Sequence, residues 1–326
     1  MGGRAGVRVV GGLAVQTLVV GALFVGWAAP AFAAHPGHGG GGGGNGGGSG
    51  GSTTTGFDVS YPQCGTTLPT PTAFGIVGVN GGLANDLNPC LGPSSSYPSY
   101  TQSELYWAVT ASVGGTSQPK TSLYVNTADP GNMYNGKPIA DWPQSSLDTD
   151  PYGTCTTTTI TVTYRGHTDT FTVGQNSDAC AWQYGYNKAQ QDATWLTGAA
   201  DAVNGQKATV AVPATPGSYP WWLDVETSNT WQSDTTMNIA DLQGMIAALQ
   251  AAGVATVGAY STSSQWDTIT GGTTTSASGS LYGIPNWIPG ATSLAGAQSN
   301  CTLPSFTGGS VSVTQWTGTP DNDYAC

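Results

Sequence analysis

The chain has 326 residues, with 18 acidic side chains against seven Lys and Arg and a net charge of −11 at pH 7. Nucleic acid is a poor partner for such a chain, because binding it relies on Lys and Arg to neutralise phosphates. An acidic, lysine-poor chain rich in Gly, Ser and Thr resembles a secreted protein that must stay soluble.

The first 33 residues have the features of a signal peptide. Arg4 and Arg8 precede an apolar stretch over residues 9–29, and residues 31–33 form a small-x-small cleavage site. We therefore expect residues 1–33 to be removed. The mature protein is then secreted, extracellular or associated with the cell wall, with no membrane attachment. Because the apolar stretch is long enough to span a bilayer, an uncleaved anchor is the alternative.

Residues 34–55 are mostly Gly, Ser and Thr and form a flexible linker. His35 and His38 lie in this tract, and we expect them to belong to a spacer rather than a metal site. The remaining residues 56–326 have the length of one large domain. We expect this domain to be a monomer.

All six cysteines lie in the domain. An even count in an exported chain indicates three disulfides, and the spacing suggests local pairs, although other pairings stay open. The local pairs are Cys64 with Cys90, Cys155 with Cys180 and Cys301 with Cys326. With no Cys-x-x-Cys, one histidine in the domain and no phosphate-binding Gly motif, we expect neither a metal nor a cofactor.

Apolar bursts alternate with helical patterns, which is typical of βα units. Seven strands are predicted, and the tail 321–326 is a candidate eighth. The seven are residues 57–60, 74–80, 122–126, 221–226, 254–260, 282–287 and 311–316.

Helices are predicted over residues 102–113 and 184–203, and a third starts at Asn238 and ends at Gly253. No helix is predicted after Tyr282. The pattern therefore predicts an α/β fold, a TIM-type (β/α) barrel whose last strands are poor in helices.

An insertion interrupts the βα pattern at about residues 131–182. Residues 157–164 and 168–173 alternate β-branched or aromatic side chains about a short turn, which predicts a β-hairpin. The flanking cysteines would staple its base. His167 lies at the turn, where an exposed turn residue is the expectation.

Residues 221–226 read Trp-Trp-Leu-Asp-Val-Glu, a buried strand that carries two carboxylates at its end. Side chains two apart on a strand share a face, and the Cα atoms of Asp224 and Glu226 would lie roughly 6.6 Å apart. This spacing suits acid chemistry on a sugar. The motif alone leaves a solvated strand end or a helix cap equally open.

Other reaction classes are disfavoured by what the domain lacks. A Ser-His-Asp or Cys-His site needs a positioned base, and the domain has one histidine, on a hairpin tip. Acids remain at the first strand (Asp58) and in the closing segment (Asp321 and Asp323). A closed barrel would bring these acids to one mouth together with the Asp-x-Glu pair.

Aromatic side chains supply the other part of a sugar site, because a flat ring stacks on a pyranose face. Most of the tryptophans near predicted strands are expected in the core. Trp287 and Trp316 are favoured as cleft residues because each ends its strand.

In their order, five motifs and a closing Asp resemble the family 25 glycoside hydrolases. These are Gly-Phe-Asp-Val-Ser at 56–60, Trp-Trp-Leu-Asp-Val-Glu at 221–226, Val-Gly-Ala-Tyr-Ser at 257–261, Ile-Pro-Asn-Trp at 284–287 and Gln-Trp at 315–316. Members of the family are lysozymes that cut the β-1,4 bond between N-acetylmuramic acid and N-acetylglucosamine in peptidoglycan. The family fold is a barrel whose last strands lack helices.

The resemblance implies that Glu226 is the acid/base and that Asp224 orients and stabilises the substrate N-acetyl group. It implies that Asp58 and Asp321 act at the sugar, with Asp323 as the alternative to Asp321. Glu226 is expected in the more apolar setting, and Asp224 is expected to be held charged by hydrogen-bond donors. Substrate-binding residues are expected to be Asn80, Tyr260, Trp287, Gln315, Trp316 and Asp323.

Two features depart from the family pattern. Asn80 stands where family lysozymes often carry Lys, and the disulfide-stapled hairpin is an insertion. The leading hypothesis is a secreted, lysozyme-like glycosidase acting on a polysaccharide of the bacterial wall. The alternative is a cell-wall carbohydrate-binding barrel that is inactive or has another specificity.

Overall fold

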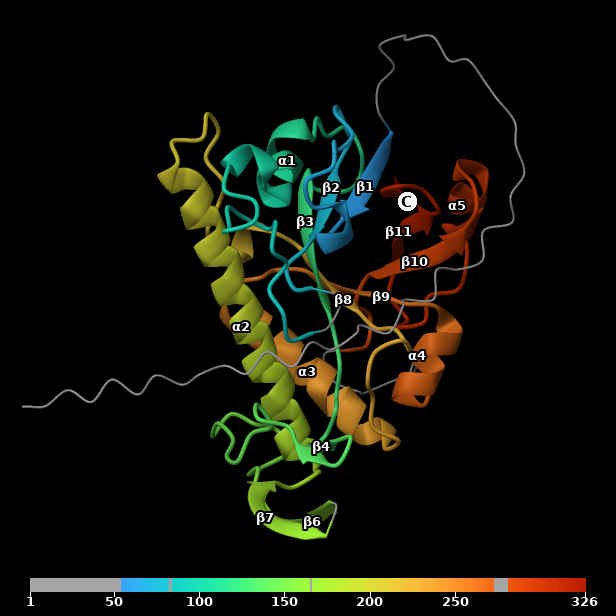
Figure 1. Cartoon of the computed structure of the whole chain (residues 1–326). Coiled ribbons are helices and arrows are strands. Elements are labelled where there is room, and N and C mark those ends of the chain that lie inside the picture. The colour runs from blue at the N-terminus through green and yellow to red at the C-terminus, as the bar shows by residue number, and fades with distance from the viewer. Residues whose placement is uncertain (1–53, 82–83, 165, 273–280) are drawn as a thin grey trace, which may run out of the picture. The chain divides into compact units, whose positions relative to one another are not determined.

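The computed structural model describes residues 54–81, 84–164, 166–272 and 281–326 (Figure 1). The predicted signal peptide and nearly all of the linker lie outside these residues. The described residues all belong to one compact unit. Among the described helices, none has both the length and the apolar character to cross a membrane.

Eight strands of the described chain close into a barrel, which confirms the predicted fold class (Figure 1). The first seven strands in chain order pair with one another in parallel, and the strand that comes last in the chain is antiparallel to both strands beside it. In barrel order they are β1 (Thr55–Val59), β12 (Asp321–Ala325), β11 (Val311–Trp316), β10 (Asn286–Ala291), β9 (Val257–Tyr260), β8 (Trp221–Asp224), β3 (Thr121–Asn126) and β2 (Gly75–Gly78). Every predicted strand overlaps one of them.

Large rings fill the inside of the barrel. Trp222 and Trp287 are each 2% exposed, and their ring centroids lie 6.0 Å apart. Gly258 of β9 is the register partner of Trp222, and a Cβ there would collide with that indole. Because the neighbouring position carries no side chain, the ring fits across the interior. The alternate residues Trp221 and Leu223 join the larger core outside the barrel.

Five α-helices of the described residues lie outside the barrel (Figure 1). They are α1 (Glu104–Ala111), α2 (Asp178–Gly205), α3 (Thr235–Ala251), α4 (Ser263–Thr270) and α5 (Leu294–Asn300). Short 3-10 turns occur at Tyr61–Gln63, Tyr100–Gln102 and Pro216–Ser218. Helices α2 and α3 approach closely at Gly185 and Gly244, where a Cβ would meet the backbone of the other helix.

Two helix predictions were wrong. Helix α5 follows Tyr282, where no helix was expected, and Ser293 caps it by accepting a hydrogen bond from the backbone of Gly296. The cap of α3 is Asp234 rather than Asn238. Asn238 is fully buried and donates from Nδ2 to the carbonyl oxygen of Ile269 at 2.9 Å, so it ties α3 to α4.

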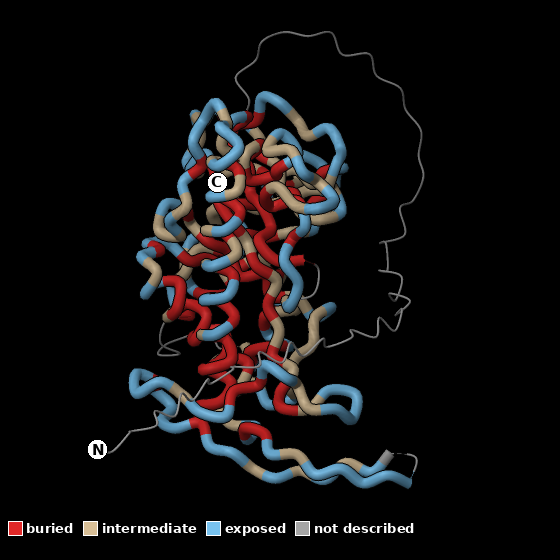
Figure 2. Tube along the Cα trace, turned by 60° about the vertical axis from the view of Figure 1, so that its left-hand side comes forward, coloured by how far each residue is buried: buried red, intermediate tan, exposed pale blue. Residues whose placement is uncertain are grey.

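The insertion follows β3 and contains two small sheets, β4 (Met133–Tyr134) with β5 (Lys137–Pro138), and β6 (Thr157–Tyr164) with β7 (His167–Gly174). The pair β6–β7 is the predicted hairpin. It lies at the end of α2 where that helix begins, and most of its length is exposed (Figures 1 and 2).

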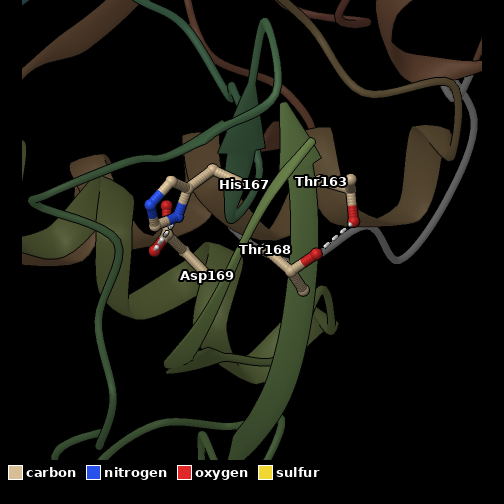
Figure 3. A network of polar contacts seen from close by, with 4 residues as sticks. All are labelled: Thr163, His167, Thr168 and Asp169. Carbon is tan, nitrogen blue, oxygen red and sulfur yellow. Dashed lines mark hydrogen bonds and ion pairs between the residues drawn. The ribbon is translucent and has the colours of Figure 1, made fainter. Parts of the chain in front are cut away.

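The hairpin tip makes few contacts. The side chain of His167 is 87% exposed and lies 3.9 Å from the carboxylate of Asp169, while the hydroxyls of Thr163 and Thr168 bond across the strands at 3.1 Å (Figure 3). The prediction of an exposed turn histidine is confirmed.

Three disulfides join the predicted local pairs, Cys64–Cys90, Cys155–Cys180 and Cys301–Cys326. In the described chain, only Cys64, Cys90 and Glu104 lie close enough together to hold a metal as a group of three. Because the two cysteines of that group are bonded to each other, they stabilise the loop before α1 covalently.

Glu104 begins α1 and is 1% exposed. Its Oε2 accepts a hydrogen bond from Asn88 Nδ2 at 2.8 Å, and its Oε1 has no hydrogen-bond partner among the described residues. Burial raises the pKa of this carboxyl from 4.5 to about 7. Between these two values the folded chain holds a proton that the unfolded chain has released.

Replacing Glu104 by glutamine should flatten the pH dependence of stability. A raised pKa gives stability that is complete below the unfolded value and is lost as pH rises through the folded value. The difference in melting temperature, Glu104→Gln minus wild type, should therefore increase from about pH 5 to about pH 8. Thermal melts across this range check the prediction, and parallel curves would contradict it.

Candidate active site

The predicted acids lie at one end of the barrel. Asp58 and Asp224 lie at or near the carboxyl ends of β1 and β8. Asp321 and Asp323 begin β12, and because β12 is antiparallel, its start lies at that same end. Asp321 is the register partner of Asp58. The antiparallel closing strand therefore brings acids from the last residues of the chain beside those of the first strand.

Asp224 lies inside the barrel between Asn126 and Tyr260, its register partners on β3 and β9. It is 7% exposed, and its Oδ1 has no hydrogen-bond partner in the described chain. Burial, and then the neighbouring charges of Glu226 and Asp58, raise its pKa well above the usual value. A buried carboxylate oxygen without a donor disfavours the charged form of Asp224.

Glu226 lies just beyond the end of β8 and is half-buried. Burial raises its pKa, and hydrogen bonds from the side chains of Gln265 and Ser228 offset part of that increase. Gln265 also accepts from the backbone N–H of Thr227 at 2.7 Å, and Trp231 donates its indole N–H to the carbonyl oxygen of Glu226 at 2.8 Å. These contacts fix both the carboxyl group and its backbone.

The environments of the two acids are the reverse of the sequence prediction. Asp224, expected to be held charged by donors, is the more deeply buried, and charge neighbours raise its pKa. Glu226, expected in the more apolar setting, accepts two side-chain hydrogen bonds. The reason is position: Asp224 still belongs to the barrel interior, whereas Glu226 follows the strand into a polar loop.

Asp58 is bound by several donors. Gln315 donates from Nε2 to Asp58 Oδ2 at 2.9 Å, and Tyr260 donates its hydroxyl to Gln315 Oε1 at 3.0 Å. Burial and the charge of Asp321 raise the pKa of Asp58 from 3.8 to about 7, although its hydrogen bonds act in the opposite direction. Two residues expected at the substrate, Tyr260 and Gln315, thus hold Asp58 in place.

Asp321 and Asp323 differ in their surroundings. Asp321 is half-buried, and its Oδ1 accepts from the backbone N–H of Gly318 at 2.9 Å. Asp323 is fully buried, and its Oδ1 accepts from the indole Nε1 of Trp287 at 2.9 Å. Of the two alternatives left open by the sequence, Asp321 is therefore the one with exposed surface near Asp58.

The expected role of Trp287 as a stacking ring does not fit its burial. At 2% exposure its faces are covered, with Tyr260 at a centroid distance of 4.6 Å and Tyr124 at 6.1 Å. The sequence suggested that Trp287 ends its strand. Instead it is the second residue of β10, and its side chain points into the barrel beneath the acids. There its indole N–H donates a hydrogen bond to the carboxyl group of Asp323.

Two further expected substrate residues have other surroundings. Asn80 is 1% exposed, accepts from the backbone N–H of Asn126 at 2.8 Å and donates to its carbonyl oxygen at 3.0 Å. It therefore holds the end of β3 beside Asp224. Trp316 shares the strand face of Thr314, which bonds the α5 backbone, so it lies on the opposite face from Gln315.

The sequence prediction did not find three residues of the site. Tyr124 of β3 hydrogen-bonds Ser60, and the charges of Asp58 and Asp224 act on it inside the barrel. The available signal was its position in the predicted strand, where alternate side chains point into the barrel. Gln265 of α4 and Ser228 of the loop after β8 hydrogen-bond Glu226. Helix α4 has too few apolar positions to be predicted from the sequence.

The site is acidic throughout. Within the described ranges, the ion pairs are His167 with Asp169 and Lys188 with Asp141, and neither includes an acid at the barrel mouth. Carboxyl groups that cannot all ionise together can supply both a proton donor and a hydrogen-bond acceptor. This arrangement is suited to acid/base chemistry.

Part of the chain matches a known family. Residues 219–283 match the family described as "Lysozyme-like protein 1". The probable GH family 25 lysozyme 4 of Dictyostelium discoideum is 41% identical over 66 residues, which are 20% of this chain and 30% of that protein. The resemblance to the family 25 glycoside hydrolases is thereby confirmed. The matched residues include Asp224, Glu226 and Tyr260.

Solved structures of lysozymes also align with the chain. The bacterial lysozyme from Streptomyces coelicolor aligns with a TM-score of 0.40 and 15% identity, over 84% of this chain and 92% of that one. The muramidase from Trichobolus zukalii aligns with a TM-score of 0.40 and 13% identity, over 84% and 94%.

Proposed function

We propose that this protein is a glycoside hydrolase that cleaves β-1,4 bonds in the glycan strands of peptidoglycan. The observation that carries the proposal is the placement of Asp224 and Glu226 at the end of β8, in the segment that resembles family 25 lysozymes. Asp58 and Asp321 lie at the same end of the barrel. The predicted signal peptide supports a substrate outside the cell.

Glu226 is the acid in the first step. The acetamide oxygen of the N-acetylmuramic acid attacks its own anomeric carbon, the bond from that carbon to the leaving oxygen breaks, and Glu226 gives its proton to that oxygen. The Glu226 carboxylate then takes a proton from water as water attacks the anomeric carbon and the acetamide oxygen leaves. This route needs no second carboxylate as nucleophile, unlike most retaining sites.

Asp224 acts on the acetamide group. The Asp224 carboxylate keeps a small exposed surface and can accept the acetamide N–H, which turns the carbonyl oxygen toward the anomeric carbon. In the free protein Asp224 is the more buried acid of the pair, and burial followed by the charge of Glu226 raises its pKa. A donor from the substrate favours the charged form of Asp224, so substrate binding shifts the shared proton toward Glu226.

The proposal is tested by incubating the protein with purified peptidoglycan and identifying released fragments by mass spectrometry. We expect fragments with N-acetylmuramic acid at the reducing end. A matched substrate with the acetamide groups removed should not be cleaved, because it lacks the attacking oxygen. Equal cleavage of both substrates would contradict the assigned route, and no cleavage of either would contradict the activity.

The second candidate is a cell-wall carbohydrate-binding barrel that is inactive or has another specificity. Asn80 favours it, because this residue replaces the Lys that family lysozymes often carry and its amide both donates to and accepts from the backbone of Asn126. Such a protein would sediment with insoluble peptidoglycan and release no fragments.

A further inference from the structure

Asp323 is a carboxyl group without a charge partner inside the barrel, just below the other acids. It is fully buried, and its register neighbours are Gly56 on β1 and Gln315 on β11. Asp58, Asp321, Asp224 and Glu226 lie at the same end of the barrel, and no described cation pairs with any of them. Ionising every acid of such a group would place several uncompensated charges in the interior.

The two oxygens of Asp323 have different surroundings. Oδ1 accepts the indole N–H of Trp287 at 2.9 Å, whereas Oδ2 finds no N–H or O–H donor among the described residues. The carboxyl group of Asp323 nevertheless lies within hydrogen-bonding reach of Asp58. Two carboxylates cannot bond each other, so this contact becomes a hydrogen bond only when one of them carries a proton.

Asp58 is the acceptor in this contact. Its Oδ2 already accepts from Gln315 Nε2 at 2.9 Å, and the Gln315 side chain is fixed by the hydroxyl of Tyr260. Asp58 also keeps more exposed surface than Asp323, and its hydrogen bonds offset part of the rise in its pKa, so it bears a charge more easily. Burial and the charge of Asp58 raise the pKa of Asp323 well above its usual value.

We infer that Asp323 is a positioning residue that stays neutral and donates its carboxyl proton to Asp58, which fixes Asp58 at the sugar. This inference rests on the proposed function for the role of Asp58. Trp287 determines which oxygen of Asp323 is free to carry the proton, because it occupies the other. The buried tryptophan thereby acts on the substrate site through two carboxyl groups.

Two substitutions separate a neutral donor from a charged carboxylate. In Asp323→Asn the amide can donate to Asp58 and accept from Trp287, as the protonated acid does, whereas Asp323→Leu can do neither. Loss of a hydrogen bond to a charged group corresponds to roughly a 10- to 100-fold loss of rate. We expect Asp323→Asn to be at least about tenfold more active on peptidoglycan than Asp323→Leu. An asparagine variant as inactive as the leucine variant would overturn the inference.

A second measurement needs neither substrate nor the leucine variant. Other buried acids of the chain also hold protons at neutral pH, so the measurement is a difference spectrum. The infrared difference between the wild type and Asp323→Asn should contain the carbonyl stretch of a protonated, buried carboxylic acid. Asp169→Asn, which changes an exposed acid on the hairpin, is the matched control and should leave the band in place. If the difference band is present but the wild type cleaves no peptidoglycan, the proposed function fails and the proton assignment stands. Without the difference band, the assignment fails.

Discussion

Glu226→Gln should lower the rate of peptidoglycan cleavage by about 10²–10⁴-fold, the usual contribution of a general acid. Glutamine keeps the shape of the side chain and can still accept from Gln265 and Ser228, the two hydrogen-bond partners of Glu226. It has no proton to give to the leaving oxygen. Because the fold does not depend on that proton and the amide removes a like charge beside Asp224, the melting temperature should not fall below that of the wild type. Initial rates of fragment release check the loss of activity, and a thermal melt checks the stability.

Glu104→Gln is the matched control for this substitution. The sequence contains two glutamates, both are at least half-buried, and Glu104 lies at α1 rather than among the acids of the barrel mouth. The same chemical change there should leave the cleavage rate close to wild type. A Glu226→Gln variant that retains more than about a tenth of the wild-type rate would assign the acid to another residue.

The barrel could be predicted from the sequence because its strands are short apolar runs that end in polar residues. The strand at 221–226 is the clearest case, since its apolar side chains point alternately into the barrel and into the core outside it. Helices α4 and α5 were missed for a physical reason. Each has eight residues or fewer and few apolar positions, so the packing that stabilises them lies in the rest of the fold.

The disulfides were predictable because each pair closes a short local loop, with sequence separations of 25 or 26 residues. The cap of α3 was not. Asp and Asn cap helices equally well, and both Asp234 and Asn238 precede apolar positions. Only the contact of Asn238 with α4 determines that it lies inside the structure.

The acids of the site were found because strand order and strand ends can be followed along a sequence. Their relative burial was not predictable. It depends on where β8 stops, which leaves Asp224 inside the barrel and Glu226 outside it. The same limit applies to Trp287, since the sequence places it near a strand end but does not show that the following residues continue β10 to Ala291.

Asp224→Asn should lower activity and raise stability at the same time. Asparagine keeps the shape of Asp224 but cannot offer a negative charge to the acetamide N–H, and loss of one such electrostatic contact costs about 10²–10³ in rate. The buried carboxyl group, in contrast, destabilises the folded chain whenever it is ionised, because its Oδ1 has no donor and Glu226 and Asp58 add like charges. A neutral amide removes that cost.

The gain in stability should depend on pH. The pKa of Asp224 is raised on folding, so its stabilising contribution is complete below the unfolded value of 3.8 and is lost as pH rises toward the folded value. The melting temperature of Asp224→Asn should therefore exceed that of wild type by more at about pH 8 than at about pH 5. Asp169→Asn makes the same change in net charge at an exposed site and should show neither effect. A loss of stability with full activity would show that Asp224 serves the fold rather than the substrate.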